Sequence, residues 1–144
     1  MFTYLAEQDG VAEFYEVDSA GISSWHVGEP PDARMIRVAS QHGFTYDGQS
    51  RQFRRSDFEK FDWIIAMDQD NTNELLRMAV TSEQAGKIHL FRSFDPLSGD
   101  DLSVPDPYYG GIQGFENVYQ IVERSTRGLL NYLEQKRLRE GEIA

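Results

Sequence analysis

The sequence predicts an α/β fold with a parallel sheet whose two faces are covered by helices. Short apolar runs typical of strands alternate along the chain with segments of helical periodicity. One run, residues 63–67 (WIIAM), is continuously apolar between two aspartates, as expected of a strand buried on both faces. Because no repeat, low-complexity tract or linker interrupts the 144 residues, we expect one domain covering residues 1–144.

The chain is expected to begin inside a helix. Within residues 1–9, Phe2, Leu5 and Ala6 have the i, i+3, i+4 spacing of one helical face. No capping residue precedes them, so this segment is interpreted as a helix whose start has been cut off.

Residues 14–18 (FYEVD) form the first candidate strand. A long loop then leads to a helix predicted from Pro30 to about Gln41, with a proline near its first turn and Gly43 in the position that ends it. Residues 44–56 show no regular pattern and are basic in places.

The second half of the chain repeats the alternation. Asp68 or Asp70 is placed to cap a helix after the strand at 63–67, and residues 87–91 (KIHLF) form a third candidate strand. Three strands are few for the helices around them, which hints at a missing strand.

The longest helix is predicted over about residues 114–138, after a turn-rich loop. Residues 139–144 are expected to fray. The apolar face of the helix is predicted to consist of Phe115, Val118, Tyr119, Val122, Leu129, Leu130 and Leu133.

Composition excludes several classes of protein. The formal net charge of −10 disfavours nucleic acid and anionic membranes as partners. The start has no signal-peptide pattern, and no stretch approaches the about 18 apolar residues of a membrane span, so we expect a cytoplasmic protein. The chain has no cysteine, which excludes a disulfide, a thiolate metal site and a cysteine nucleophile within it.

The histidines give no sign of a metal site. His26, His42 and His89 lack zinc-ligand spacing, and the acidic residues form no convincing metal site either, so we expect no metal and no cofactor. His89 falls in a predicted strand and is interpreted as structural, whereas His42 is interpreted as a capping or hydrogen-bonding residue.

Asp106 is the most promising chemical residue. Two flanking prolines restrain its backbone, and Tyr108 and Tyr109 follow it. It could therefore be a proton donor beside an aromatic wall, or part of an Asp-Pro turn. Trp25, in a predicted loop, could line a recognition site or pack on the core.

Taken together, several segments resemble the low-molecular-weight protein tyrosine phosphatase family. VDSAGISSWHVGEPPDAR, QHG, DFEKFDWIIAMDQDN, DPYYGG and GFENVYQIVER follow one another in the family's order. The resemblance implies a doubly wound, four-stranded parallel sheet (phosphotyrosine phosphatase I-like). It also implies hydrolysis of phosphotyrosine proteins or small aryl phosphates through a phosphocysteine. The oligomeric state stays open.

The same resemblance implies roles for single residues. Asp106 matches the general acid and base of the family. Tyr108 and Tyr109 match aromatic residues that line the phosphotyrosine cleft, and Trp25 matches an aromatic position on the opposite wall.

Other matching residues have supporting roles in the family. Ser19 and His42 match positions that brace the phosphate-binding loop by hydrogen bonds. Asp68 lies in a matching M-D-x-x-N stretch and is expected to be structural.

The sequence departs from the family at its start. Family members begin with an apolar strand and a C-x5-R-[ST] loop, whose amides and arginine hold the phosphate and whose cysteine attacks phosphorus. Met1 aligns inside the helix after this loop, so we expect an N-terminally truncated domain that lacks an interior strand and is inactive alone. The chain would then be a phosphatase whose sequence starts too late, or a non-catalytic phosphatase-like binding module. Arsenate reductases share the fold but rely on several cysteines, so the absence of cysteine disfavours this class of enzyme.

Overall fold

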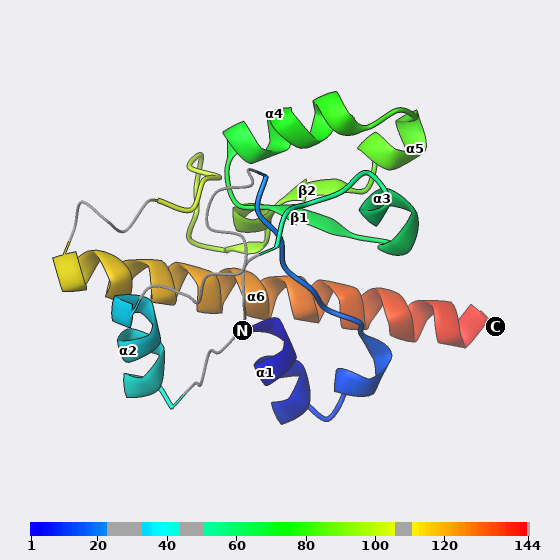
Figure 1. Ribbon diagram of the computed structural model, residues 1–144. Coiled ribbons are helices and arrows are strands. Elements are labelled where there is room, and N and C mark those ends of the chain that lie inside the picture. Colours follow the sequence, from blue (N-terminus) through cyan, green and yellow to red (C-terminus); the bar gives the residue numbers. More distant parts are fainter. Residues whose placement is uncertain (23–32, 44–50, 106–110, 144) are drawn as a thin grey trace.

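The computed structural model describes residues 1–22, 33–43, 51–105 and 111–143. Figure 1 shows a short sheet in the middle, with helix α4 on one side and the long helix α6 on the other. Helices α1 and α2 pack against α6. Helices thus cover both faces of a parallel sheet, which confirms the predicted α/β class.

The sheet of the described residues has two parallel strands, β1 (Ile64–Ala66) and β2 (Ile88–Leu90). They confirm the predicted strands at 63–67 and 87–91. Ile64 lies opposite Ile88, and its N–H donates to the Lys87 carbonyl at 2.9 Å. Ile64 and Ala66 pack with Phe58 and Leu75, whereas Ile65 is half-buried and Met67 is exposed, so the predicted burial on both faces is found on one face only.

The predicted strand at 14–18 is wrong. Residues 12–14 form a short 3-10 helix, η1 (Ala12–Phe14), and residues 15–20 have no regular structure. A strand exists only where a neighbour pairs with its backbone, whatever its side chains favour. Among the described residues the nearest bridge, between Gly21 and Gln52, lies three residues after the predicted strand.

Two of the predicted helices are confirmed in the first half of the chain. The segment at 1–9 forms α1 (Phe2–Gln8), and the next predicted helix forms α2 (Ala33–Gln41), whose predicted proline start lies outside the described residues. Gly43 ends α2 with φ +78°, the left-handed conformation expected of it.

The helix after β1 is α4 (Gln69–Met78). Asp68 caps it, because its side chain accepts the Asn71 N–H at 2.7 Å, which settles the choice between two candidate caps. Two one-turn helices were not predicted: α3 (Asp57–Lys60) and α5 (Ser82–Ala85).

The last helix, α6 (Gly111–Ile143), is longer than predicted at both ends. The expected fraying after residue 138 is wrong, because no proline interrupts the helix and Lys136 pairs with Glu140 at 3.4 Å, one turn apart. Most of the predicted apolar face is buried. The buried face also includes Ser125 and Thr126.

Helix α6 lies very close to a 3-10 helix, η2 (Phe91–Phe94), that follows β2. A Cβ atom on Gly128 would lie 1.9 Å from the carbonyl oxygen of Phe94. Only glycine permits this approach, because the opposing atom belongs to the backbone and cannot rotate away.

No helix among the described residues combines the length and the apolar character that crossing a bilayer requires.

Because a Cβ atom on Gly128 would clash with the Phe94 carbonyl, Gly128→Ala should destabilise the fold by about 1–3 kcal/mol, the usual cost of overpacking. Urea unfolding of the 144-residue chain measures this cost. Asn131→Ala, an exposed position one turn further along α6, is the control and should change stability by less than about 0.5 kcal/mol. Equal effects of the two substitutions would contradict the close approach.

Candidate functional site

The structure describes two of the predicted site residues, Ser19 and His42. Ser19 lies in an extended segment and His42 in the turn after α2, and no hydrogen bond between them is found in the described structure. The other predicted site residues lie outside the described residues, so their roles stay predictions: Trp25, Asp106, Tyr108 and Tyr109.

The segment that leads to Asp106 is anchored to the sheet. The Val104 N–H donates to the Met67 carbonyl at 2.8 Å, directly after the carboxyl end of β1. Helix α6 begins at Gly111, on the other side of the undescribed residues. In parallel α/β sheets ligands bind outside the carboxyl ends of the strands, so the chain enters the Asp106 segment at the edge where a site is expected.

A buried carboxylate, Asp95, holds the loop before Val104 against α6. Its oxygens accept hydrogen bonds from Arg124 at 3.1 and 3.3 Å and from the Leu97 N–H at 2.9 Å, and Arg92 lies 3.5 Å away. Burial alone would raise the pKa of Asp95, but these partners outweigh it and hold the pKa below its usual range. Asp95 is therefore ionised at neutral pH.

Arg92 extends this brace toward the Asp106 segment. It is buried, donates to the Ser103 carbonyl at 3.1 Å and pairs with Asp101 at 3.2 Å. The loop from η2 to residue 103 is thus fixed at both ends by charged side chains.

His42 joins the end of α2 to the first turns of α6. Its Nε2 lies 2.7 Å from a carboxylate oxygen of Glu116, and its ring stacks on Tyr119 at 4.1 Å between centroids. Hydrogen bonds from Gln120 and His42 lower the pKa of Glu116. This contact confirms His42 as a hydrogen-bonding residue and places its partner on α6, five residues after Gly111.

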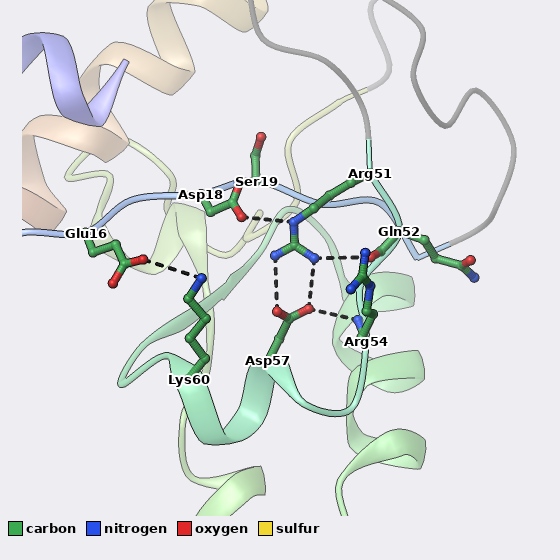
Figure 2. Close-up of polar contacts among 8 residues, drawn as sticks. All are labelled: Glu16, Asp18, Ser19, Arg51, Gln52, Arg54, Asp57 and Lys60. Carbon is green, nitrogen blue, oxygen red and sulfur yellow. Dashed lines mark hydrogen bonds and ion pairs between the residues drawn. The ribbon is translucent and has the colours of Figure 1, made fainter.

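Ser19 lies in an extended segment held by Arg51 (Figure 2). The backbone N–H of Ser19 donates to Asp18 at 2.8 Å, and the same carboxylate accepts from the Arg51 guanidinium at 2.9 Å. Arg51 therefore fixes the extended backbone around Ser19 through the carboxylate of Asp18.

Arg51 is itself fixed by Asp57, a buried residue at the start of α3. Two guanidinium nitrogens donate to the two oxygens of Asp57 at 3.0 and 3.2 Å, and the Arg54 N–H donates at 2.8 Å (Figure 2). Burial opposes ionisation of Asp57, but these bonds outweigh it and lower its pKa. Sequence reasoning missed this pair; the basic character of residues 51–55 was its only signal.

A hollow of about 530 Å³ lies between α1, α6 and Pro96. Two arginines in its wall are already paired, Arg124 with Asp95 and Arg127 with Asp9 at 2.5 Å. Their charges are neutralised within the protein, so we assign no ligand to this hollow. In the described ranges, no group of three His, Asp or Glu side chains is placed to hold a metal ion.

Arg51→Ala should cost about 1–3 kcal/mol of unfolding free energy at neutral pH, because Asp57 is left buried without its main partner. Since folding lowers the pKa of Asp57, the pair contributes stability above the ordinary carboxyl pKa of about 3.9 and loses it as the pH falls through the folded-state value. The cost of the substitution should therefore shrink between pH 7 and about pH 3 in urea unfolding.

Arg77→Ala is the matched control, because Arg77 forms an exposed pair with Glu74. It should cost less than about 1 kcal/mol and show no such pH trend. An Arg51→Ala cost that is equal at both pH values would contradict the role given to Asp57.

Comparisons with known proteins agree with this fold. The family model described as low molecular weight phosphotyrosine protein phosphatase matches residues 1–139. A Streptomyces coelicolor relative, "Low molecular weight protein-tyrosine-phosphatase", is 43% identical over 131 residues, which are 90% of this chain and 80% of that protein.

Solved structures give the same result. The Entamoeba histolytica protein tyrosine phosphatase crystallised with Hepes in its active site superimposes with a TM-score of 0.88 at 37% identity, over 94% of this chain and 86% of that chain. The Drosophila arginine phosphatase superimposes with a TM-score of 0.82 at 33% identity, over 92% and 85%. The chain therefore belongs to the low-molecular-weight phosphotyrosine protein phosphatase family.

Proposed function

We propose that this chain supplies the leaving-group acid and the aromatic cleft of a protein tyrosine phosphatase, with Asp106 as the general acid and base. The observation that best supports this proposal is the bond between Val104 and Met67. It anchors the backbone at the carboxyl edge of the sheet, two residues before Asp106. The contact of Asp95 with Arg124 restrains the chain before Asp106, and the contact of His42 with Glu116 restrains the first turns of α6 after it.

The proposed reaction has two steps. A cysteine thiolate attacks phosphorus, the bond from phosphorus to the phenolic oxygen breaks, and the Asp106 carboxyl gives its proton to that oxygen. The Asp106 carboxylate then takes a proton from the water that attacks the phosphocysteine, which releases phosphate and regenerates the thiolate. This chain holds no cysteine, so the thiolate has to come from residues outside these 144.

The proposed substrates are phosphotyrosine proteins or small aryl phosphates. Tyr108 and Tyr109 would line one wall of the cleft and Trp25 the other. The net charge of −10 repels a phosphorylated substrate, so its attraction has to be local to the phosphate site. We further propose that the protein acts in the cytoplasm.

The second candidate is a non-catalytic binding module that uses the same aromatic walls. The absence of cysteine is the observation that favours it. The two functions differ in whether a nucleophile joined to this chain produces an enzyme.

The 144-residue chain should not hydrolyse p-nitrophenyl phosphate, because a general acid without a nucleophile forms no phosphoenzyme. A colorimetric assay of the purified 144-residue protein measures this. Hydrolysis that is lost in Asp106→Ala would contradict the prediction, since it would show catalysis without a cysteine.

Joining an apolar strand and a C-x5-R-S loop ahead of Met1 should produce activity, and Asp106→Asn should then lower kcat by about 100- to 10,000-fold on phenyl phosphate. The loss should be smaller on p-nitrophenyl phosphate, whose leaving group needs less protonation. Steady-state kinetics on both substrates give the two ratios. Equal losses would show that Asp106 is not the leaving-group acid, and no activity in the joined protein would favour the binding module.

A further inference from the structure

Arg92 is a buried cation that the neighbouring carboxylate does not need as a partner. Its side chain is only 8% exposed. The nearby Asp95 already accepts two hydrogen bonds from Arg124 and one from the Leu97 N–H. The Nε atom of Arg92 lies 3.5 Å from Asp95, and within the described ranges it has no hydrogen-bond partner. Because burying a guanidinium is costly unless it is well paired, the contacts that keep Arg92 in place have to lie elsewhere.

Those contacts are made with Ser103 and Asp101. One guanidinium nitrogen of Arg92, Nη1, donates to the Ser103 carbonyl at 3.1 Å and lies 3.2 Å from a carboxylate oxygen of Asp101. The other oxygen of Asp101 accepts the Ser103 N–H at 3.2 Å. The three residues thus close a ring in which both backbone groups of Ser103 are held. We call Arg92 and Asp101 together the Ser103 clamp.

The clamp connects the end of the loop back to the helix before it. Within the loop, the Ser98 N–H donates to the Asp95 carbonyl at 3.2 Å, and the Asp101 N–H donates to the Ser98 carbonyl at 3.0 Å. These bonds join residues 95–101 to one another. Arg92 joins the far end of the loop to η2, because it belongs to η2 itself.

The chain between the clamp and Asp106 is restrained. The Val104 N–H is held by the Met67 carbonyl at 2.8 Å. Pro105 has a fixed φ, and a residue that precedes proline favours extended conformations. A shift of the Ser103 backbone is therefore passed on toward Asp106, three residues later, because little free rotation is left between them.

We propose that Arg92 and Asp101 are positioning residues for Asp106, which act through the backbone of Ser103. The clamp itself rests on the contacts above, and its effect on the reaction rests on the proposed function. A general acid has to lie within hydrogen-bond reach of the leaving oxygen, and a displacement of about 1 Å can lower the rate by about 100-fold. Loss of the clamp should therefore lower kcat more than it raises KM.

Asp101→Ala tests the clamp in the 144-residue chain. The side chain of Asp101 is 71% exposed, so its removal should change global stability little. In amide hydrogen exchange followed by NMR, Ser103 and Val104 should exchange at least about tenfold faster, with no change at Ile64 in β1. Asp100→Ala is the matched control, because Asp100 is an exposed neighbour without a hydrogen bond or ion pair in the described structure. It should leave all three amides unchanged.

Arg92→Met gives a second measurement, because it removes the charge and keeps an elongated side chain in the core. The exchange rate of Val104 divided by that of Ile64 corrects for any loss of global stability, and this ratio should rise. An unchanged ratio in both Asp101→Ala and Arg92→Met would overturn the clamp. So would an equal rise in Asp100→Ala.

The effect on the reaction is tested in the protein that carries an apolar strand and a C-x5-R-S loop ahead of Met1. There, Asp101→Ala should lower kcat on phenyl phosphate by about 10- to 100-fold, and by less on p-nitrophenyl phosphate, whose leaving group needs less protonation. Added to Asp106→Asn, it should cause little further loss, because the clamp acts through that carboxyl. Full additivity of the two losses would overturn the positioning role.

The clamp and the proposed function can fail separately. Faster exchange at Ser103 with no activity in any joined protein would confirm the clamp and overturn the proposed function, and with it the effect on kcat. Activity that depends on Asp106 and not on Asp101 would support the proposed function and overturn the positioning role.

Discussion

The approach of α6 to η2 is the constraint on which the other contacts depend. Gly128 lets the helix touch the Phe94 backbone, and Arg124, one turn earlier, then reaches the buried carboxylate of Asp95. Helices α1 and α2 pack on the same α6, so its position also sets theirs. The loop that begins at Asp95 runs to the carboxyl end of β1, and the place of the proposed acid is thereby a consequence of this helix packing.

Charged side chains order the segments that the sheet does not pair. Arg51 fixes the backbone around Ser19, Arg92 fixes the loop before Val104, and His42 fixes the first turns of α6. Each of these side chains contacts a carboxylate whose pKa is lowered in the folded protein. The carboxylate is Asp57 for Arg51, Asp95 for Arg92 and Glu116 for His42. These three contacts are therefore ionic, and they hold their geometry at neutral pH and weaken in acid.

Local signals in the sequence predicted much of this fold. The apolar run at 63–67 and the cap at Asp68 were readable because each depends on neighbouring residues. The strand predicted at 14–18 failed because a strand depends on a partner that sequence preference does not supply. The pair of Arg51 and Asp57, and the approach at Gly128, could not be predicted, because they join elements whose meeting follows only from the tertiary packing. Asp106 was found through its prolines and tyrosines, and its role stays a prediction.

One claim of the structure is that, among the described residues, the backbone groups of Ile65 and Ala20 have no hydrogen-bond partner, unlike those of their neighbours. Amide hydrogen exchange of the free chain, followed residue by residue by NMR, tests it most directly. The account predicts slow exchange at Ile64 and Ala66, which pair with β2, and at Gly21, which pairs with Arg51 and Phe53. It predicts fast exchange at Ile65, between Ile64 and Ala66, and at Ala20, next to Gly21. Protection of Ile65 equal to that of Ile64 would show that its amide is already paired and would contradict the account.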